Sequence, residues 1–239
     1  DGTTITSSET TVIRAENKTI KDWLNAKEDS SVGYKDYNSL SAGASAVDGT
    51  GIVNETTITH TTDVNIGKVT INANAAPVTD AEQAQGVSLD DKTALELSAY
   101  SNVVSKDYQY IGSGAAIEAA YIDNSNVATS TTNITISDDA KLNAGDVAGA
   151  KETTSKSAVV ADGVANVDVK GGKIVISASN EADMYSKTYV DVWGAVNYAG
   201  SNNDVTFNSI AKTNVAGDLE TANGDILITS GRDVEGNIS

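Results

Sequence analysis

The chain has 239 residues, no cysteine and a formal net charge of −17, from 33 acidic and 16 basic residues. The missing cysteine excludes disulfides and thiolate metal sites. The acidic balance argues against nucleic acid as a partner and against adhesion to anionic lipid through a basic face. No apolar run approaches the ~18–20 residues that cross a bilayer, so we expect no membrane insertion.

The N-terminal quarter differs from the rest of the chain. Within residues 1–16, the segment TTITSSETTVIRA resembles strand sequence. Within residues 17–50, IKDWLNAKEDS predicts a short helix and GYKDYNSLSAGASAVDGTG predicts a loop. We therefore assign residues 1–55 to irregular N-terminal coils that carry a loop and short-helix insert at 17–50.

Residues 56–239 repeat one short pattern: a polar residue, an aliphatic one, any residue, a second aliphatic one, then Asn, Ser or Thr. The alternation has period two, so each copy predicts a short β-strand with one buried face. Strand-like matches recur about every 20 residues, which is typical of repeat architectures. The six clearest copies are Val69/Ile71, Leu95/Leu97, Ile134/Ile136, Ile174/Ile176, Val205/Phe207 and Ile226/Ile228.

The repeat favours an all-β solenoid with coils of about 20 residues, in which residues 56–239 form a shaft. One such coil cannot bury its apolar face alone, whereas coils stacked ~4.8 Å apart pair every strand with its neighbours. The Asn, Ser and Thr that follow each strand would then stack as hydrogen-bonded ladders at the corners. An antiparallel β-sandwich subunit is the alternative with the same strands, although it normally carries turn signals every 8–12 residues and more aromatic side chains.

The coil pattern, the Ala/Asn/Thr/Val/Gly bias and the segment NVAGDLETANGDILITSGRDVEG (214–236) resemble large repetitive filamentous adhesins. These are the filamentous-haemagglutinin-like and leukotoxin-type exoproteins of type V secretion. The resemblance covers residues ~56–239 and implies a right-handed parallel β-helix displayed on the bacterial surface. It specifies a shaft and no ligand, and the family offers no catalytic residues to carry over.

These observations predict a non-enzymatic structural or adhesive segment of an extracellular filament, in biofilm or at the bacterial cell surface. Its expected partners are flanking repeats of the same polypeptide or copies of itself end to end, and surface glycans or proteins. The chain reads as a fragment of a longer array, with binding grafted on the loops at 74–92 and 179–188 or on the insert. One alternative is a polymerising surface-filament or sheath subunit that donates a strand from residues 1–16.

A carbohydrate-binding or carbohydrate-active β-helix protein is the second alternative. Glycoside hydrolysis needs two carboxylates across the bond, and the adjacent pairs Asp90-Asp91 and Asp138-Asp139 are the acidic candidates. Neighbouring residues on a strand point to opposite faces, so solvated turn positions account for them better. His60 is the only histidine, so it cannot join other histidines at a metal.

Two further sets of side chains are candidates for binding. Oxygen-rich text at Asp123, Asn124 and Asn126, and at Asp204, is a weak calcium candidate, although neither stretch matches an EF-hand loop or the nonapeptide calcium repeat. Asx-turns explain such text more simply, so no cofactor is expected. The aromatic side chains of Trp23, Trp193 and Tyr198 are candidate ligand contacts through ring stacking on a sugar, or else anchors for a loop on the shaft.

Overall fold

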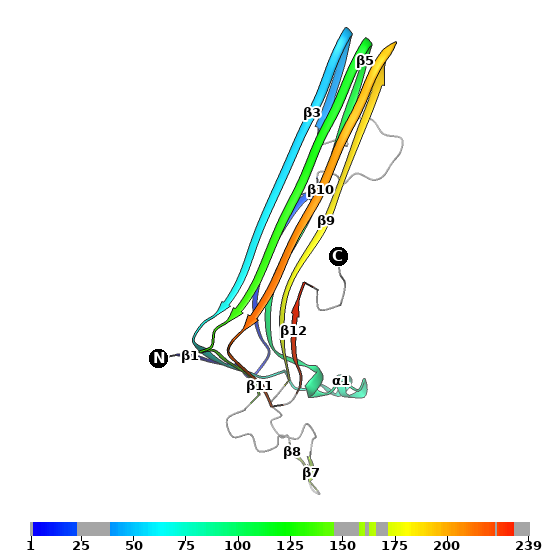
Figure 1. Cartoon of the computed structure of the whole chain (residues 1–239). Coiled ribbons are helices and arrows are strands. Elements are labelled where there is room, and N and C mark those ends of the chain that lie inside the picture. The colour runs from blue at the N-terminus through cyan, green and yellow to red at the C-terminus, as the bar shows by residue number, and fades with distance from the viewer. Residues whose placement is uncertain are drawn as a thin grey trace.

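The computed structural model describes residues 2–22, 39–145, 158–160, 163–165, 172–222 and 224–231, and this part of the chain is almost entirely β-strand (Figure 1). One short helix, α1 (Asp80–Ala84), and one 3-10 turn, η1 (Leu89–Asp91), lie between strands. The strands are β1 (Thr3–Thr6), β2 (Thr11–Asp22), β3 (Ser39–Ile66), β4 (Val69–Ala73), β5 (Thr93–Ile136), β6 (Lys141–Ala144), β7 (Ala158–Val160), β8 (Gly163–Ala165), β9 (Lys173–Trp193), β10 (Val196–Val215), β11 (Asp218–Thr221) and β12 (Ile226–Ser230).

The longest strand, β5, folds back on itself. Gln109 Nε2 donates to Asn124 Oδ1 at 3.0 Å, although 15 residues separate them. A straight strand of that length would hold them about 50 Å apart at ~3.3 Å per residue. The chain therefore runs out along one arm to about Ala115 and returns along a second arm from Ile117 (Figure 1). We call these the outgoing arm and the returning arm.

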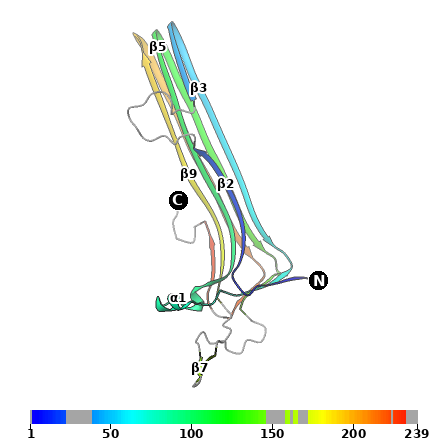
Figure 2. The same ribbon diagram turned by 180° about the vertical axis from the view of Figure 1, so that it is seen from behind.

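Successive passes of the chain pair in parallel on both arms. On the outgoing arm, β5 pairs with β2, the start of β3 and β9. On the returning arm, it pairs with the rest of β3 and with β10. Figure 2 shows the same long strands side by side from behind. This parallel pairing excludes the antiparallel sandwich, and it places Thr3–Thr6 and Thr11–Asp22 in strands that pair within the chain.

The spacing between equivalent positions corrects the expected repeat of about 20 residues. Asn54 contacts Asn124 at a separation of 70 residues, and Asn124 contacts Asn203 at a separation of 79. Several copies of the short motif therefore fall within one long pass. Local periodicity reports alternation along a strand, but the number of strand segments in one pass depends on where the chain reverses.

The base of the molecule holds its apolar core. Strands β1, β4, β6 and β11 form a four-stranded parallel sheet there, with β4 and β6 inside and β1 and β11 at its edges. Ile71 and Leu142 of this sheet pack with the ends of the long strands nearest the base. The fully buried side chains of this cluster include Ala73, Leu95, Leu97, Ile134, Leu142, Ile174 and Ile176.

All six copies of the motif lie in strands, as predicted. Burial of both aliphatic residues is confirmed at Leu95/Leu97, Ile134/Ile136 and Ile174/Ile176, which lie within the core. It is wrong at Ile226/Ile228, which are 42% and 45% exposed because β12 is the outermost strand beside β9. Burial in this fold thus depends on a neighbouring pass as well as on the alternation.

Two predicted irregular segments are strand in the structure. The insert at 17–50 is corrected at both ends, because β2 extends to Asp22 and β3 begins at Ser39. Residues 23–38, with most of the predicted helix, lie outside the described residues. The loop predicted at 179–188 belongs to β9, because its polar outward positions alternate with inward ones. The loop at 74–92 is confirmed as the connection that carries α1 and η1.

Candidate functional site

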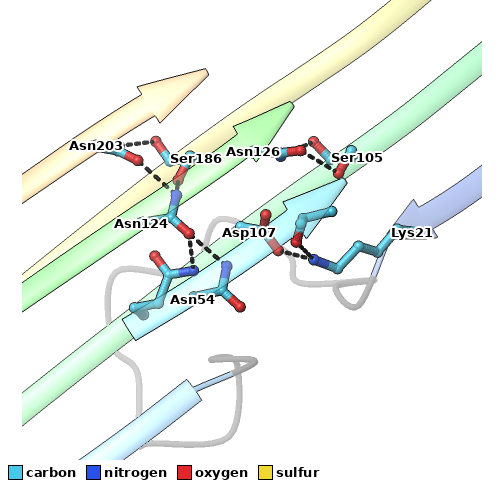
Figure 3. Close-up of polar contacts among 10 residues, drawn as sticks. Lys21, Asn54, Ser105, Asp107, Asn124, Asn126, Ser186 and Asn203 are labelled. Carbon is cyan, nitrogen blue, oxygen red and sulfur yellow. Dashed lines mark hydrogen bonds and ion pairs between the residues drawn. The ribbon is translucent and has the colours of Figure 1, made fainter. Parts of the chain in front are cut away.

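The interior between the two arms is mainly polar, and an amide ladder crosses three passes there (Figure 3). Asn54 Nδ2 donates to Asn124 Oδ1 at 2.5 Å, and Asn124 Nδ2 donates to Asn203 Oδ1 at 2.8 Å. Asn124 also accepts from Gln109 Nε2 and donates to Ser186 Oγ, so it joins the outgoing arm to the returning arm. Because Asn124 is fully buried, each of these bonds replaces one that water would otherwise make.

A second amide contact lies at the base, where Asn143 Nδ2 donates to Asn72 Oδ1 at 2.9 Å. Asn72 directly follows the aliphatic pair of its motif copy, so this contact forms at the kind of position where the sequence predicted a ladder. The larger ladder in the arms was not predicted in that place, because the stretches around Asn124 and Asp204 were interpreted as calcium candidates or Asx-turns.

A buried ion pair lies deeper in the arm interior (Figure 3). Lys21 Nζ is 2.5 Å from Asp107 Oδ1, and it also donates to Thr56 Oγ1. Asp107 is fully buried, whereas the Lys21 side chain is 23% exposed. A carboxylate in this place needs a cation, because an uncompensated buried charge is strongly destabilising. Sequence analysis missed the pair, since 86 residues separate its members.

His60 lies on the inward face of β3 and belongs to the same polar interior. Its Nε2 lies 2.7 Å from Thr19 Oγ1, and its Nδ1 lies 2.8 Å from Ser101 Oγ. Burial lowers the pKa of the imidazole, because the charged form loses hydration there. Ser101 in turn contacts Ser130 at 3.0 Å, so the imidazole is part of a structural chain of polar contacts.

The aromatic candidates lie on outward faces near the end of the arms. Trp193 ends β9 and is 71% exposed, and its Nε1 donates to Asp191 Oδ1 at 2.8 Å. Tyr198 is exposed on β10, beside Tyr121, whose ring lies over the position that a Cβ of Gly200 would take. Trp193 and Tyr198 thus lie on different arms, and the contacts described for each side chain do not join them into one aromatic patch. Trp23 lies outside the described residues.

The calcium candidates do not point to a common centre. Asn124 and Asn126 face the arm interior and are fully buried, and Asn126 Oδ1 accepts from Ser105 Oγ. Asp123 faces outward and accepts from Asn202. Asp204 is exposed and accepts from Thr206. Successive side chains of a strand point to opposite faces, so Asp123 lies on the outward face and Asn124 and Asn126 lie on the inward face, although the three residues are close in the sequence.

The two acidic pairs serve as turn residues. Asp91 accepts from the backbone N–H and hydroxyl of Ser88 at 2.9 and 2.7 Å, which lowers the pKa of its carboxyl group. Asp138 and Asp139 are exposed in the turn between β5 and β6. Neither arrangement places two carboxylates across a cleft.

No protein-family model, curated protein or solved structure matches this chain. In the part of the chain that the structure describes, no three or more His, Asp or Glu side chains gather where they would hold a metal ion. No helix among the described residues is long and apolar enough to span a membrane.

Proposed function

We propose that this chain is a non-enzymatic structural segment of a bacterial extracellular filament or adhesin shaft, built as a parallel β-helix with coils of 70 to 80 residues. The observation that carries the proposal is the parallel, in-register pairing of successive long passes. A right-handed turn of the helix and a location at the cell surface follow from the sequence resemblance and are part of the proposal.

The mechanical role follows from continuous pairing along the stacking direction. Each pass that pairs on both sides contributes a ladder of backbone hydrogen bonds, as β5 does with β3 and β10. Side-chain contacts such as Asn54–Asn124–Asn203 run in the same direction and oppose sliding of one pass over the next. A shaft of this kind resists bending and proteolysis without any residue acting chemically.

The two outer passes offer complementary edges for further passes. β3 pairs with β5, and β5 pairs with β10 in the same direction. Among the described strands, β10 therefore has one unpaired edge, of the same kind as the edge of β5 that β10 covers. β12 already begins another pass, because Ile226 lies beside Ile174 as Ile174 lies beside Leu95. We propose that flanking repeats of the same polypeptide, or another copy, supply the pass that covers β10.

Cryo-electron microscopy of the purified chain tests this function. We expect rods or filaments with an axial spacing near ~4.8 Å. The variant Val205→Lys places a charge on the inward face of β10, where a further pass would cover it, and should shorten the rods. Ile117→Lys is the matched control, because it adds the same charge at an exposed outward position of the central strand β5. Compact particles, or equal lengths for the two variants, would contradict the proposal.

A second candidate function is glycan or protein binding through the outward aromatics. It is favoured by the exposure of Trp193 and by the neighbouring Tyr189, which stacks on Tyr110 with ring centroids 5.7 Å apart. A glycan array with wild-type chain and Trp193→Ala would show signals that the substitution removes. Val196→Ala, an exposed non-aromatic change nearby, should leave those signals intact.

A further inference from the structure

The end of the arms holds a buried carboxylate that the shaft function does not use. Glu118 is 2% exposed, and neither of its carboxylate oxygens has a hydrogen-bond partner among the described residues. It lies on the inward face of β5, in the row that continues through Ala120 and Ile122. An ionised carboxylate sealed in this way is costly unless a counter-charge accompanies it.

The residues beside Glu118 in register add further oxygens. Asp48 of β3 is its neighbour on one side and Asn197 of β10 is its neighbour on the other. In-register neighbours on parallel strands lie about 4.8 Å apart and share a face, so these three side chains point into the same space. Three adjacent passes therefore supply oxygen ligands: β3 supplies the carboxylate of Asp48, β5 the carboxylate of Glu118 and β10 the amide of Asn197.

The outgoing arm supplies two more oxygens to this space. Ser113 Oγ lies 3.1 Å from Asp48 Oδ2 and 3.1 Å from the carbonyl oxygen of Gly43. Its single hydroxyl hydrogen cannot fully satisfy both acceptors. Among the described residues, the backbone N–H of Gly49 is the other donor to Asp48, at 2.9 Å from Oδ1. In this part of the chain, oxygen acceptors thus outnumber donors around Asp48 and Glu118.

Gly43 makes this approach of Asp48 possible. A Cβ at position 43 would lie 1.8 Å from Asp48 Oδ2, so any other residue there would displace the carboxylate. The carboxylate crosses from the returning arm to the outgoing arm, where it accepts from Ser113 Oγ and lies beside the Gly43 backbone.

We propose that Asp48, Glu118, Ser113, Asn197 and the Gly43 carbonyl group bind a hard divalent cation of the Ca²⁺ class. Such ions take six to eight oxygen ligands, and carboxylates, amide and backbone carbonyls and waters are the usual ones. Two carboxylates balance the charge of a divalent ion, and neutral oxygens complete its shell. The cation joins three passes at the end of the arms, where the apolar cluster of Ile111, Ala120 and Ile122 is small. The site lies within one chain, so it does not depend on filament formation.

Isothermal titration of the full, chelator-stripped chain with CaCl₂, and separately with MgCl₂, tests the site. We expect saturable Ca²⁺ binding near one ion per chain, weakened by more than about tenfold in Glu118→Gln. Glu55→Gln is the matched control, because Glu55 lies outward on the same strand as Asp48 and should leave binding unchanged. Thermal unfolding should show a Ca²⁺-dependent rise in Tm for the wild type and for Glu55→Gln but not for Glu118→Gln.

A second variant keeps the test decisive if Glu118→Gln does not fold. Gly43→Ala leaves both carboxylates in the chain but displaces Asp48, so it should weaken Ca²⁺ binding as well. The absence of saturable Ca²⁺ binding to the wild type would overturn the site, as would unchanged binding in both variants. Filament length is measured separately, so a failed cation site and a failed shaft function give different results.

Discussion

The base and the arm interior have the same parallel backbone ladder but opposite kinds of side chain. In the base, columns of Ile, Leu and Ala fill the space between strands, and Leu97 and Ile176 are fully buried neighbours in register. In the arms, most inward residues are polar, with apolar ones such as Ile111 and Ile122 among them. Asn124 alone contacts four other side chains. The backbone arrangement therefore does not require an apolar interior along its whole length.

The difference shows how two tasks are divided in this molecule. Apolar burial is non-directional, so the base contributes free energy of folding but discriminates weakly between nearby registers. Polar columns contribute less free energy, since each bond replaces one to water. A slip by one residue would nevertheless leave buried donors and acceptors unpaired throughout the arms. The base thus supplies stability, and the arm interior specifies the register.

The largest expected effect comes from the base. Leu97→Ala should lower the free energy of unfolding by about 4 kcal/mol, because it removes buried apolar surface and leaves a cavity between passes. Urea denaturation measures the change. Val53→Ala removes an apolar group that is 82% exposed and should have almost no effect. Equal effects of the two substitutions would break the assignment of stability to the base.

The ion pair in the arms should come next. Lys21→Met removes the cation beside the fully buried Asp107 and should cost about 3 kcal/mol in unfolding free energy. Lys106→Met is the control, because the contact of Lys106 with Asp183 is more exposed and is worth about 1 kcal/mol or less. If Lys21→Met lowered the free energy of unfolding as little as Lys106→Met does, the charge of Asp107 in the arm interior would be well hydrated.

Disrupting the amide ladder should lower the free energy of unfolding less than the loss of the ion pair does. Its main effect should be faster local opening of the strands in the arms. Asn124→Ala leaves the amides of Asn54 and Gln109 without their shared acceptor, at a cost of about 2 kcal/mol. Hydrogen exchange should show faster opening of β3, β5 and β10 in the arms with the base still protected. Asn208→Ala, on an exposed 3.5 Å contact, is the control. Uniform loss of protection would show that the ladder does not act locally.

The smallest effect is a pH dependence in the connection that carries α1. The backbone N–H of Thr79 and the ammonium group of Lys92 lower the pKa of Glu82 from 4.5 to about 2. The unfolded chain therefore takes up this proton first as the pH falls. The stabilisation is present above pH 4.5 and is lost as the pH falls through about 2. Carbon-13 NMR titration of the carboxyl group measures the pKa directly.

The variant Glu82→Gln isolates this contribution from the other carboxylates. The difference in urea midpoint between wild type and Glu82→Gln should be largest near pH 7 and should shrink toward pH 2. A constant difference across that range would mean that the capping contacts of Glu82 do not depend on its charge.

The sequence correctly predicted strands at the six motif copies and failed on strand lengths. Alternation places Leu95, Ile134 and Ile174 on buried faces, because side-chain direction along a strand is a local property. The stretch at 179–188 was interpreted as a loop, since only Ala182 and Met184 of its inward residues are apolar and the apolar alternation is short. Its inward residue Ser186 accepts from Asn124, which lies 62 residues away in the sequence.

By itself the sequence determined that the chain is β-rich, that it folds in regular layers of small side chains and that some Asn residues stack between passes. Only the tertiary structure decided where the chain reverses, and therefore that equivalent positions lie 70 and 79 residues apart. It also brought together Lys21 with Asp107, and Asp48 with Ser113. The physical reason is that hydrogen-bonding side chains need partners at about 3 Å, and which residues come that close depends on the whole path of the chain.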